Sequence, residues 1–474
     1  MLNRREFLNV AGGTTAFQAV IPTRETKNLL MLTMDQHRAD CTGCYGNRVV
    51  RTPVMDRLAR EGVRFARHFV QAPQCVPSRG SLHTGRYPHV HRAFTNRFRL
   101  PDREQTLARV LHERGYKTAC IGERPFAPNN STGGFGEICG EEEHRALLKK
   151  EGWEGSKVAE FESKLKETFQ AYPVPWGEEL DVSTVTANLA VDFLRRNQAG
   201  PFFLQASFRR PHHPFDPPRP YDRMYAQAEF PKPQRRANEF STKPPEQQRA
   251  LESTAGFDLR KLTDSDLRRI CSHYYGSITL TDKCLGRILD EVEALGLSGK
   301  TLVVFNSDHG EMLGDHGLLF KGGYMYDQVL HVPLIMRFPE VLPAGRVVEP
   351  ATQEIDQMPT LLRLLNAPLP DGVQGRSLLP LIPDAAGPVR WDETVYAEFP
   401  NIKMVRTPDR KLVYYPGRPY GELYDLRNDP QELENLWADP GRAADKQEMM
   451  ARLTDWLIAS HDPLPPAVEA PEVR

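Results

Sequence analysis

Three apolar runs along the chain have the length of a buried strand. They cover residues 27–34, 201–207 and 301–307, and the acids Asp35 and Asp308 directly follow the first and the third. Continuous apolar runs of this length are typical of parallel strands that are buried on both faces of a sheet. Open α/β sheets bind their ligands at the carboxyl ends of such strands. The pattern therefore predicts a functional site around Asp35 and Asp308.

Helix-like segments alternate with these runs. Helices are expected at residues 52–69, 103–114, 182–197 and 267–295, and a further strand at residues 117–122. Alternating strands and helices favour a large, mostly parallel sheet that is sandwiched by helices. Segments 125–155 and 213–257 are rich in proline, glycine and charged residues. Because both are too long for plain connectors, we expect them to form loops that face the substrate.

The pattern changes from about residue 391 onward. Short strand-like pieces at residues 395–399, 404–406, 411–415 and 422–426 precede one helical stretch at residues 446–459. These pieces predict a small antiparallel sheet with one helix. We therefore expect a catalytic α/β domain over residues 27–388 and a smaller antiparallel α+β subdomain over residues 389–474.

The charge balance argues against two classes of partner. The chain of 474 residues has 61 basic and 62 acidic side chains, and its formal net charge is -1. Such a balance does not favour a nucleic acid or an acidic membrane surface as the main partner. No apolar run approaches the roughly 20 residues that a membrane-spanning helix needs, so no membrane span is expected.

The first 24 residues have a pattern of their own. Arg4 and Arg5 precede Phe7 and Leu8, and a weakly apolar stretch follows at residues 10–21. This order resembles a twin-arginine export signal, which carries folded proteins. We therefore expect residues 1–24 to direct the protein to the periplasm or out of the cell. If the segment is an ordinary disordered terminus instead, the protein stays in the cytoplasm.

Asp35 and Asp308 are each followed by another possible metal ligand, Gln36 and His309. Two carboxylates at one sheet edge repel each other unless a cation lies between them. Either acid alone could instead cap a helix. Together the four residues predict a site for a divalent metal. Since imidazole is a softer ligand than oxygen, His309 leaves Mn²⁺ or another transition metal open.

The most unusual segment starts at Cys75 and reads Cys-Val-Pro-Ser-Arg, with Thr84-Gly85 shortly after it. Proline suits the first turn of a helix, so Cys75 should lie at a helix N-terminus, where free backbone N–H groups favour an anion. Arg79 is four residues further on and shares the same helix face. A structural cysteine that caps a helix is the simpler alternative. The segment resembles the signature of the formylglycine-dependent sulfatases of the alkaline phosphatase superfamily.

This resemblance extends from about residue 28 to residue 436. It implies an alkaline-phosphatase-like fold and the hydrolysis of a sulfate ester, a sulfated carbohydrate if the protein is exported. It also implies that a formylglycine-generating enzyme converts Cys75 to formylglycine, whose hydrate is the nucleophile and holds one hydroxyl on the metal. The family usually binds Ca²⁺. The implied metal site consists of Asp35, Gln36, Cys75, Asp308 and His309.

The resemblance assigns further residues to the substrate. Lys321 follows Asp308 at the spacing of the family's lysine, which contacts the sulfate. His212 follows the middle strand in a Pro-His-His-Pro-Phe string and matches the histidine that acts as the leaving-group acid. Asn96 aligns with an asparagine that contacts substrate in some relatives. The implied catalytic residues are thus Cys75, Arg79, His212 and Lys321.

One segment departs from the family pattern. Many sulfatases carry Gly-Lys-x-His after the strand that ends near residue 121, but here Glu123 and Pro125 replace the lysine and the histidine. This change weakens the binding of the sulfate group, unless Arg124 contacts the substrate in place of the missing lysine and histidine. Phosphonate monoester hydrolases, a related branch, also lack that lysine and histidine. Two alternatives therefore stay open: a phosphonate monoester or phosphodiester hydrolase on the same scaffold, and a non-catalytic protein that binds anions.

Overall fold

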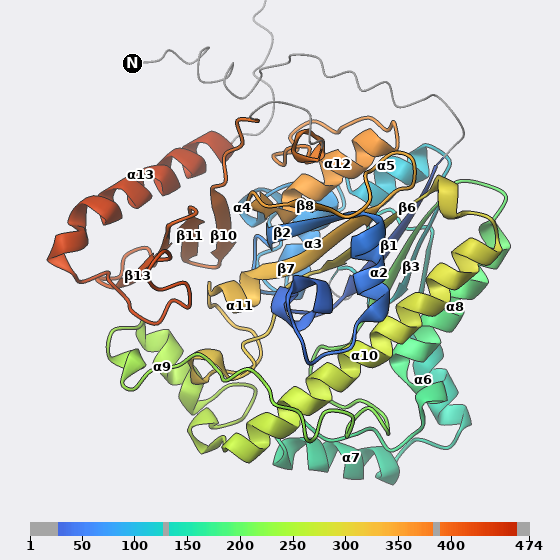
Figure 1. Cartoon of the computed structure of the whole chain (residues 1–474), viewed down its shortest axis with the longest axis horizontal. Coiled ribbons are helices and arrows are strands. Elements are labelled where there is room, and N and C mark those ends of the chain that lie inside the picture. The colour runs from blue at the N-terminus through green and yellow to red at the C-terminus, as the bar shows by residue number, and fades with distance from the viewer. Residues whose placement is uncertain (1–26, 127–131, 383–388, 462–474) are drawn as a thin grey trace, which may run out of the picture.

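A computed structural model describes residues 27–126, 132–382 and 389–461 (Figure 1). The expected export signal at residues 1–24 lies outside the described residues. The main sheet has the strand order β4-β3-β5-β1-β6-β7-β2-β8, and β9 pairs with β2. Its strands are β1 (Asn28–Met34), β2 (Val63–Phe69), β3 (Lys117–Gly122), β4 (Glu137–Gly140), β5 (Phe202–Phe208), β6 (Thr301–Ser307), β7 (His331–Arg337), β8 (Arg346–Val348) and β9 (Thr352–Gln353).

The three apolar runs of the sequence lie side by side in this sheet. β1 is parallel to both β5 and β6, and Met34 at its end pairs with Phe208 and with Ser307. The mostly parallel sheet expected from the sequence is therefore confirmed, with β7 as an antiparallel strand between β6 and β2. This register brings the segments that follow β1, β5 and β6 to one edge of the sheet.

Helices cover both faces of the sheet (Figure 1). Leu30 and Leu32 of β1 belong to a core with α2 (Pro53–Glu61), α8 (Val182–Asn197) and α10 (Asp264–Ala294). Leu29 and Met31 belong to a second core with α3 (Cys75–Thr84), α5 (Leu107–Glu113) and α12 (Gln357–Leu364). Successive side chains of a strand point to opposite faces, so a continuous apolar run fills both cores.

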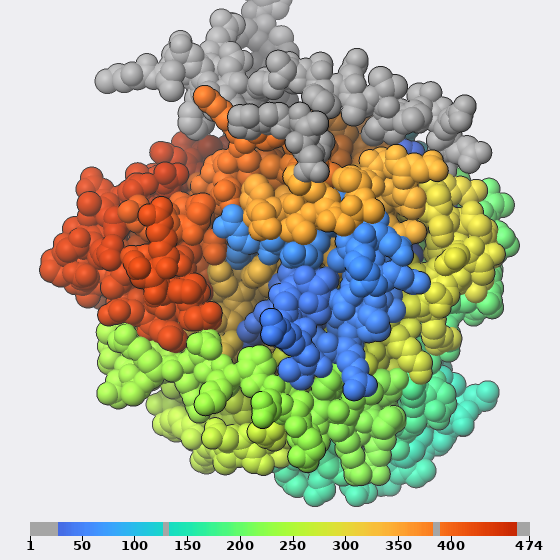
Figure 2. All heavy atoms as spheres, in the orientation of Figure 1, coloured from blue at the N-terminus to red at the C-terminus, as the bar shows by residue number. Residues whose placement is uncertain are grey.

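A second, antiparallel sheet stands beside the first. It consists of β10 (Val395–Phe399), β11 (Ile402–Arg406), β12 (Arg410–Tyr414) and β13 (Gly421–Asp425), and α13 (Ala443–Ser460) packs on it through Leu453 and Trp456. In Figure 2 this unit lies against the segment that carries α9 (Pro245–Glu252). The small antiparallel α+β unit is thus confirmed, whereas the boundary at residue 388 stays a prediction.

Two expectations about local structure were wrong. Residues 52–69 are not one helix, because α2 ends at Glu61 and β2 begins after Gly62. Val63 and Phe65 of β2 are fully buried and pair with β7 and β8. Segments 125–155 and 213–257 are not only loop, since the first contains β4 and α6 (Glu141–Lys150) and the second contains α9. Among the described residues, no helix combines the length and apolar character that a membrane crossing requires.

A buried ion network joins the two sheets. Asp327, the first residue of α11 (Asp327–Leu330), accepts from Arg406 Nη2 at 3.0 Å and from Lys411 Nζ at 2.6 Å. Lys411 also contacts Glu432 at 2.5 Å, and its side chain is fully buried. Burial would raise the pKa of Asp327, but the charges of Arg406 and Lys411 outweigh it and hold the pKa well below the usual range.

We expect Asp327→Asn to lower the free energy of unfolding by about 3 kcal/mol at neutral pH, because it leaves buried cations short of a partner. A carboxyl group whose pKa is lowered by folding stabilises the protein above its unfolded pKa of about 3.9. The loss should therefore be constant above about pH 5 and shrink below about pH 4. Thermal unfolding against pH measures it. Asp290→Asn, at an exposed pair with Arg57, is the control, and equal stability of the two variants would contradict the prediction.

Candidate active site

Cys75 is the first residue of α3, as its sequence context predicted. Its Sγ lies 3.0 Å from Lys321 Nζ, 3.3 Å from His309 Nε2 and 3.9 Å from Asp35 Oδ1. The Nδ2 of Asn96 is 3.6 Å from the same sulfur. The structure therefore brings five of the residues singled out in the sequence to one point at the carboxyl edge of the sheet.

Arg79 organises the two strand-end acids. Its guanidinium, 2% exposed, donates from Nε to Asp308 Oδ2 at 2.8 Å and from Nη2 to Asp35 Oδ2 at 2.6 Å. Its Nη1 donates to the carbonyl of Arg124 at 2.6 Å. Because both Oδ2 atoms are engaged by Arg79, the Oδ1 atoms of the two acids face the other side, toward Cys75 and His309.

The ligand atoms of Asp35, Cys75, Asp308 and His309 all lie within 4.8 Å of one another. Nδ1 of His309 is 2.9 Å from the carbonyl of Gly310, an acceptor, so Nδ1 carries the hydrogen and Nε2 presents a lone pair. Nε2 is 3.5 Å from Asp35 Oδ1 and 3.8 Å from Asp308 Oδ1. Two carboxylate oxygens and an imidazole nitrogen that converge in this way fit a divalent cation.

Gln36 reaches the same site with a left-handed backbone, at a φ of 65°. Its N–H donates to Asp308 Oδ1 at 3.1 Å, and its side-chain oxygen accepts from Lys321 Nζ at 3.1 Å. Its amide nitrogen contacts Glu311. Glu311 was not predicted as a site residue, although it lies only two residues after His309.

The electrostatics of the site favour fixed cations. Burial lowers the pKa of Lys321, but the adjacent Cys75 and the carboxylates of Asp35 and Asp308 outweigh burial and raise the pKa overall. Burial, and next the charge of Asp35, raises the pKa of the Cys75 thiol to about 12. An unmodified Cys75 is thus a thiol at neutral pH, whereas nucleophilic cysteines are thiolates.

His212 and His213 form a stacked pair beside this cluster, with ring centroids 4.1 Å apart. His213 Nδ1 is 3.2 Å from Gln36 Nε2, and Nδ1 of His212 contacts the carbonyl of His213. Burial, and next the charge of Lys321, lowers the pKa of both rings well below the usual value. Both imidazoles are therefore neutral at neutral pH, and Nε2 of His212 is the ring nitrogen not used in this contact.

The segment that departs from the family pattern forms one rim of the site. Burial raises the pKa of Glu123 above its usual value, although the charge of Arg79 acts in the opposite direction. Arg124 touches the site through its carbonyl, which accepts from Arg79, whereas its guanidinium pairs with Glu142 at 3.1 Å on the surface. The substrate contact expected of the Arg124 side chain stays a prediction.

Two buried residues that were not predicted as site residues, Ser78 and Glu354, lie beside Asp308. Ser78 Oγ lies 2.5 Å from the carbonyl of Asp308 and 2.6 Å from Glu354 Oε2. Burial raises the pKa of Glu354 well above its usual range, so its protonated carboxyl can donate to Ser78 while Ser78 donates to the carbonyl. Glu354 is 276 residues from Ser78 in the sequence, and no motif marks it.

Two family models match the chain. The model named sulfatase matches residues 27–367, and the model for the C-terminal region of N-sulphoglucosamine sulphohydrolase matches residues 314–458. An arylsulfatase of Clostridium perfringens is 32% identical over 86% of this chain and 90% of its own length. An N-acetylglucosamine-6-O-sulfatase of Bacteroides thetaiotaomicron is 25% identical over 91% of this chain and 86% of its own length.

A solved structure is also similar over most of its length. The phosphonate monoester hydrolase of Agrobacterium radiobacter has a TM-score of 0.81 and 29% identity, over 92% of this chain and 96% of that one. The family match covers most of the chain and includes the segments that carry Asp35, Cys75, Asp308 and Lys321. The chain therefore belongs to the sulfatase family, a family of sulfuric ester hydrolases within the alkaline phosphatase superfamily.

Proposed function

We propose that this chain is a formylglycine-dependent sulfatase in which Cys75 is converted to formylglycine beside a bound divalent metal. The observation that carries the proposal is the position of Cys75 Sγ, 3.0 Å from Lys321 Nζ and 3.3 Å from His309 Nε2 at the start of α3. A negative charge at this point is stabilised by the helix N-terminus and by Lys321. The formylglycine hydrate would supply both the attacking hydroxyl and a second hydroxyl that allows the sulfate to leave.

Asp35, Asp308 and His309 are the proposed protein ligands of the metal, with the side-chain oxygen of Gln36 next to them. A metal bound here supplies Lewis-acid stabilisation of developing negative charge. The carboxylate oxygens favour Ca²⁺, and the imidazole of His309 keeps Mn²⁺ as the second candidate. Arg79 holds both carboxylates in place through its two hydrogen bonds to their Oδ2 atoms.

The remaining site residues are assigned to the ester. Lys321 and Asn96 would bind sulfate oxygens, since both contact Cys75 Sγ. His212 would donate a proton to the leaving alcohol. The negative charge of a bound sulfate opposes the effect of Lys321 and raises the pKa of His212, which favours the proton-donating form. Arg124, whose side chain is 44% exposed, would reach the substrate by leaving Glu142.

The substrate proposed is a sulfated carbohydrate. The relative named as an N-acetylglucosamine-6-O-sulfatase and the export-like start of the sequence both support this class. Maturation requires a formylglycine-generating enzyme as a partner. We place the mature protein in the periplasm or outside the cell, with the cytoplasm as its location if residues 1–24 are not used as a signal.

A second candidate is a phosphonate monoester or phosphodiester hydrolase that uses the same residues. The similarity to the Agrobacterium radiobacter enzyme favours it, as does the lack of the lysine and histidine that many sulfatases have at positions 123 and 125. A non-catalytic anion-binding protein is the third. It has less support, because a binder does not need the full set of Asp35, Cys75, Asp308 and Lys321.

Parallel assays of matched esters separate these candidates. With matured protein and Ca²⁺, kcat/KM for 4-nitrophenyl sulfate should exceed that for 4-nitrophenyl methylphosphonate by at least about tenfold, which is a difference of about 1.4 kcal/mol in transition-state stabilisation. Both esters release 4-nitrophenol, so they differ only in the acid portion, which is sulfate in one and methylphosphonate in the other. The reverse order would favour the phosphonate hydrolase. Turnover of neither ester, nor of N-acetylglucosamine 6-sulfate, by protein whose Cys75 peptide has the mass of formylglycine would favour the binding protein.

A further inference from the structure

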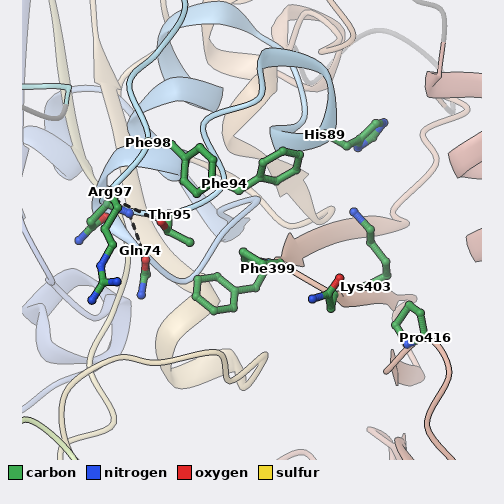
Figure 3. Close-up of a pocket in the computed structure, with 12 residues that line it drawn as sticks. Gln74, His89, Phe94, Thr95, Arg97, Phe98, Phe399, Lys403 and Pro416 are labelled. Carbon is green, nitrogen blue, oxygen red and sulfur yellow. Dashed lines mark hydrogen bonds between the residues drawn. The ribbon is translucent and has the colours of Figure 1, made fainter.

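A hollow of about 880 Å³ lies near the proposed nucleophile, and Figure 3 shows residues that line it. Gln74 and Asn96 belong to its lining. Asn96 Nδ2 is 3.6 Å from Cys75 Sγ, and Asn96 Oδ1 accepts from the N–H of Val76 at 3.0 Å. A group in this hollow therefore lies near an ester that is held at Cys75.

Three phenylalanine rings dominate the walls. Phe94 and Phe98 come from the loop that follows α4 (Pro88–His91), and their ring centroids are 6.0 Å apart with the planes at 85°. Phe399 comes from the end of β10 and lies across from them in Figure 3. Phe98 is 48% exposed. An exposed aromatic ring that faces two others in a concave surface suits a flat apolar partner.

Two of the polar side chains that line the hollow are engaged within the protein. His89 uses Nδ1 for Glu398 at 2.7 Å and Nε2 for Ser460 at 2.9 Å. The amine of Lys403 is paired with the same Glu398. The surface of the lining is mainly apolar, and the guanidinium of Arg97 also belongs to it. The hollow is thus built to recognise shape and an apolar face more than a pattern of hydroxyl groups.

We propose that Phe94, Phe98 and Phe399 form a ring-binding subsite, which holds the ring of the ester's alcohol portion through an apolar face. This rests on the proposed function, because Cys75 must mark the point of attack. An aromatic ring offers such a face, and so does the C–H face of a sugar ring. The subsite combines the loop of residues 94–98 with the end of β10, so the small antiparallel sheet contributes to specificity as well.

The variant Phe98→Ala tests the subsite, with Leu369→Ala as control. Leu369 is 53% exposed and is not in the lining. Both variants are assayed on 4-nitrophenyl sulfate, N-acetylglucosamine 6-sulfate and ethyl sulfate, which has no ring. Loss of one aromatic contact should lower kcat/KM for at least one ring ester about 3- to 10-fold. Ethyl sulfate, and all three esters with Leu369→Ala, should stay within about twofold of the parent protein.

The arms of the test identify the ring. A loss confined to the nitrophenyl ester assigns the subsite to an aromatic ring, and a loss confined to the sugar ester assigns it to a carbohydrate. An equal loss for ethyl sulfate, or no loss for either ring ester, would overturn the proposal. If the parent protein prefers phosphonates, phenyl and ethyl methylphosphonate replace the sulfates. The comparison of phenyl with ethyl esters then still tests the subsite, while the comparison of sulfates with phosphonates tests the proposed function.

Discussion

Replacement of Cys75 by alanine should abolish turnover of every ester. The side chain lies at the start of α3, 3.0 Å from Lys321 Nζ and 3.3 Å from His309 Nε2. Loss of a covalent nucleophile lowers kcat by about 10⁴-fold or more. The measurement is kcat for matured protein and for Cys75→Ala, together with the mass of the peptide that contains residue 75.

Cys44→Ala is the matched control, because Cys44 is a half-buried cysteine outside the metal group. It should retain full activity. Cys75→Ser adds a sharper test, since a serine hydroxyl can attack once but has no second hydroxyl with which to release the sulfate. We expect at most one equivalent of product per chain from this variant. Sustained turnover by Cys75→Ala would show that residue 75 does not take part in the reaction, and it would contradict both hydrolase candidates.

The part of the site that the sequence predicted consists of local strings. Asp35 and Asp308 end apolar runs, and parallel neighbouring strands must bring such ends together. Cys75 and Arg79 are placed by one helix, whose first turn is marked by proline. Each of these patterns lies within a short sequence segment. The fold then only has to bring the three segments that carry Asp35, Cys75 and Asp308 to the same edge of the sheet.

What the sequence left open depends on contacts between distant segments. The apolar spacing of α2 continues through Val63, and only the pairing of Val63 and Phe65 with β7 and β8 makes that stretch a strand. Glu354 reaches Ser78 from far along the chain. The ring-binding subsite joins Phe98 to Phe399, which no periodicity relates. Burial and pairing with distant segments determine the structure at such positions, so a local sequence pattern cannot predict it.

Loss of one proposed metal ligand should remove both metal binding and activity. Asp308→Asn keeps the size of the side chain but replaces a carboxylate, which faces Asp35, Cys75 and His309 within 4.8 Å, by a neutral amide. A ligand that binds only the folded state stabilises it and so raises the unfolding temperature. At a ligand concentration of 100 times the dissociation constant, the free energy of unfolding increases by about 2.7 kcal/mol. Metal-free parent protein titrated with Ca²⁺ and with Mn²⁺ should show this rise, and Asp308→Asn should not.

The substitution also removes a partner of the buried Arg79, so a lower unfolding temperature alone proves nothing about metal. Asp181→Asn controls for this, because Asp181 is fully buried and pairs with the buried Arg210 at 2.6 Å outside the metal group. Asp181→Asn should unfold at a lower temperature yet keep the metal-dependent rise. Asp308→Asn should lose the rise, together with about 10³-fold or more of kcat. An undiminished rise in Asp308→Asn would place the metal elsewhere, and the larger response of the parent protein to Ca²⁺ or to Mn²⁺ would identify the preferred ion.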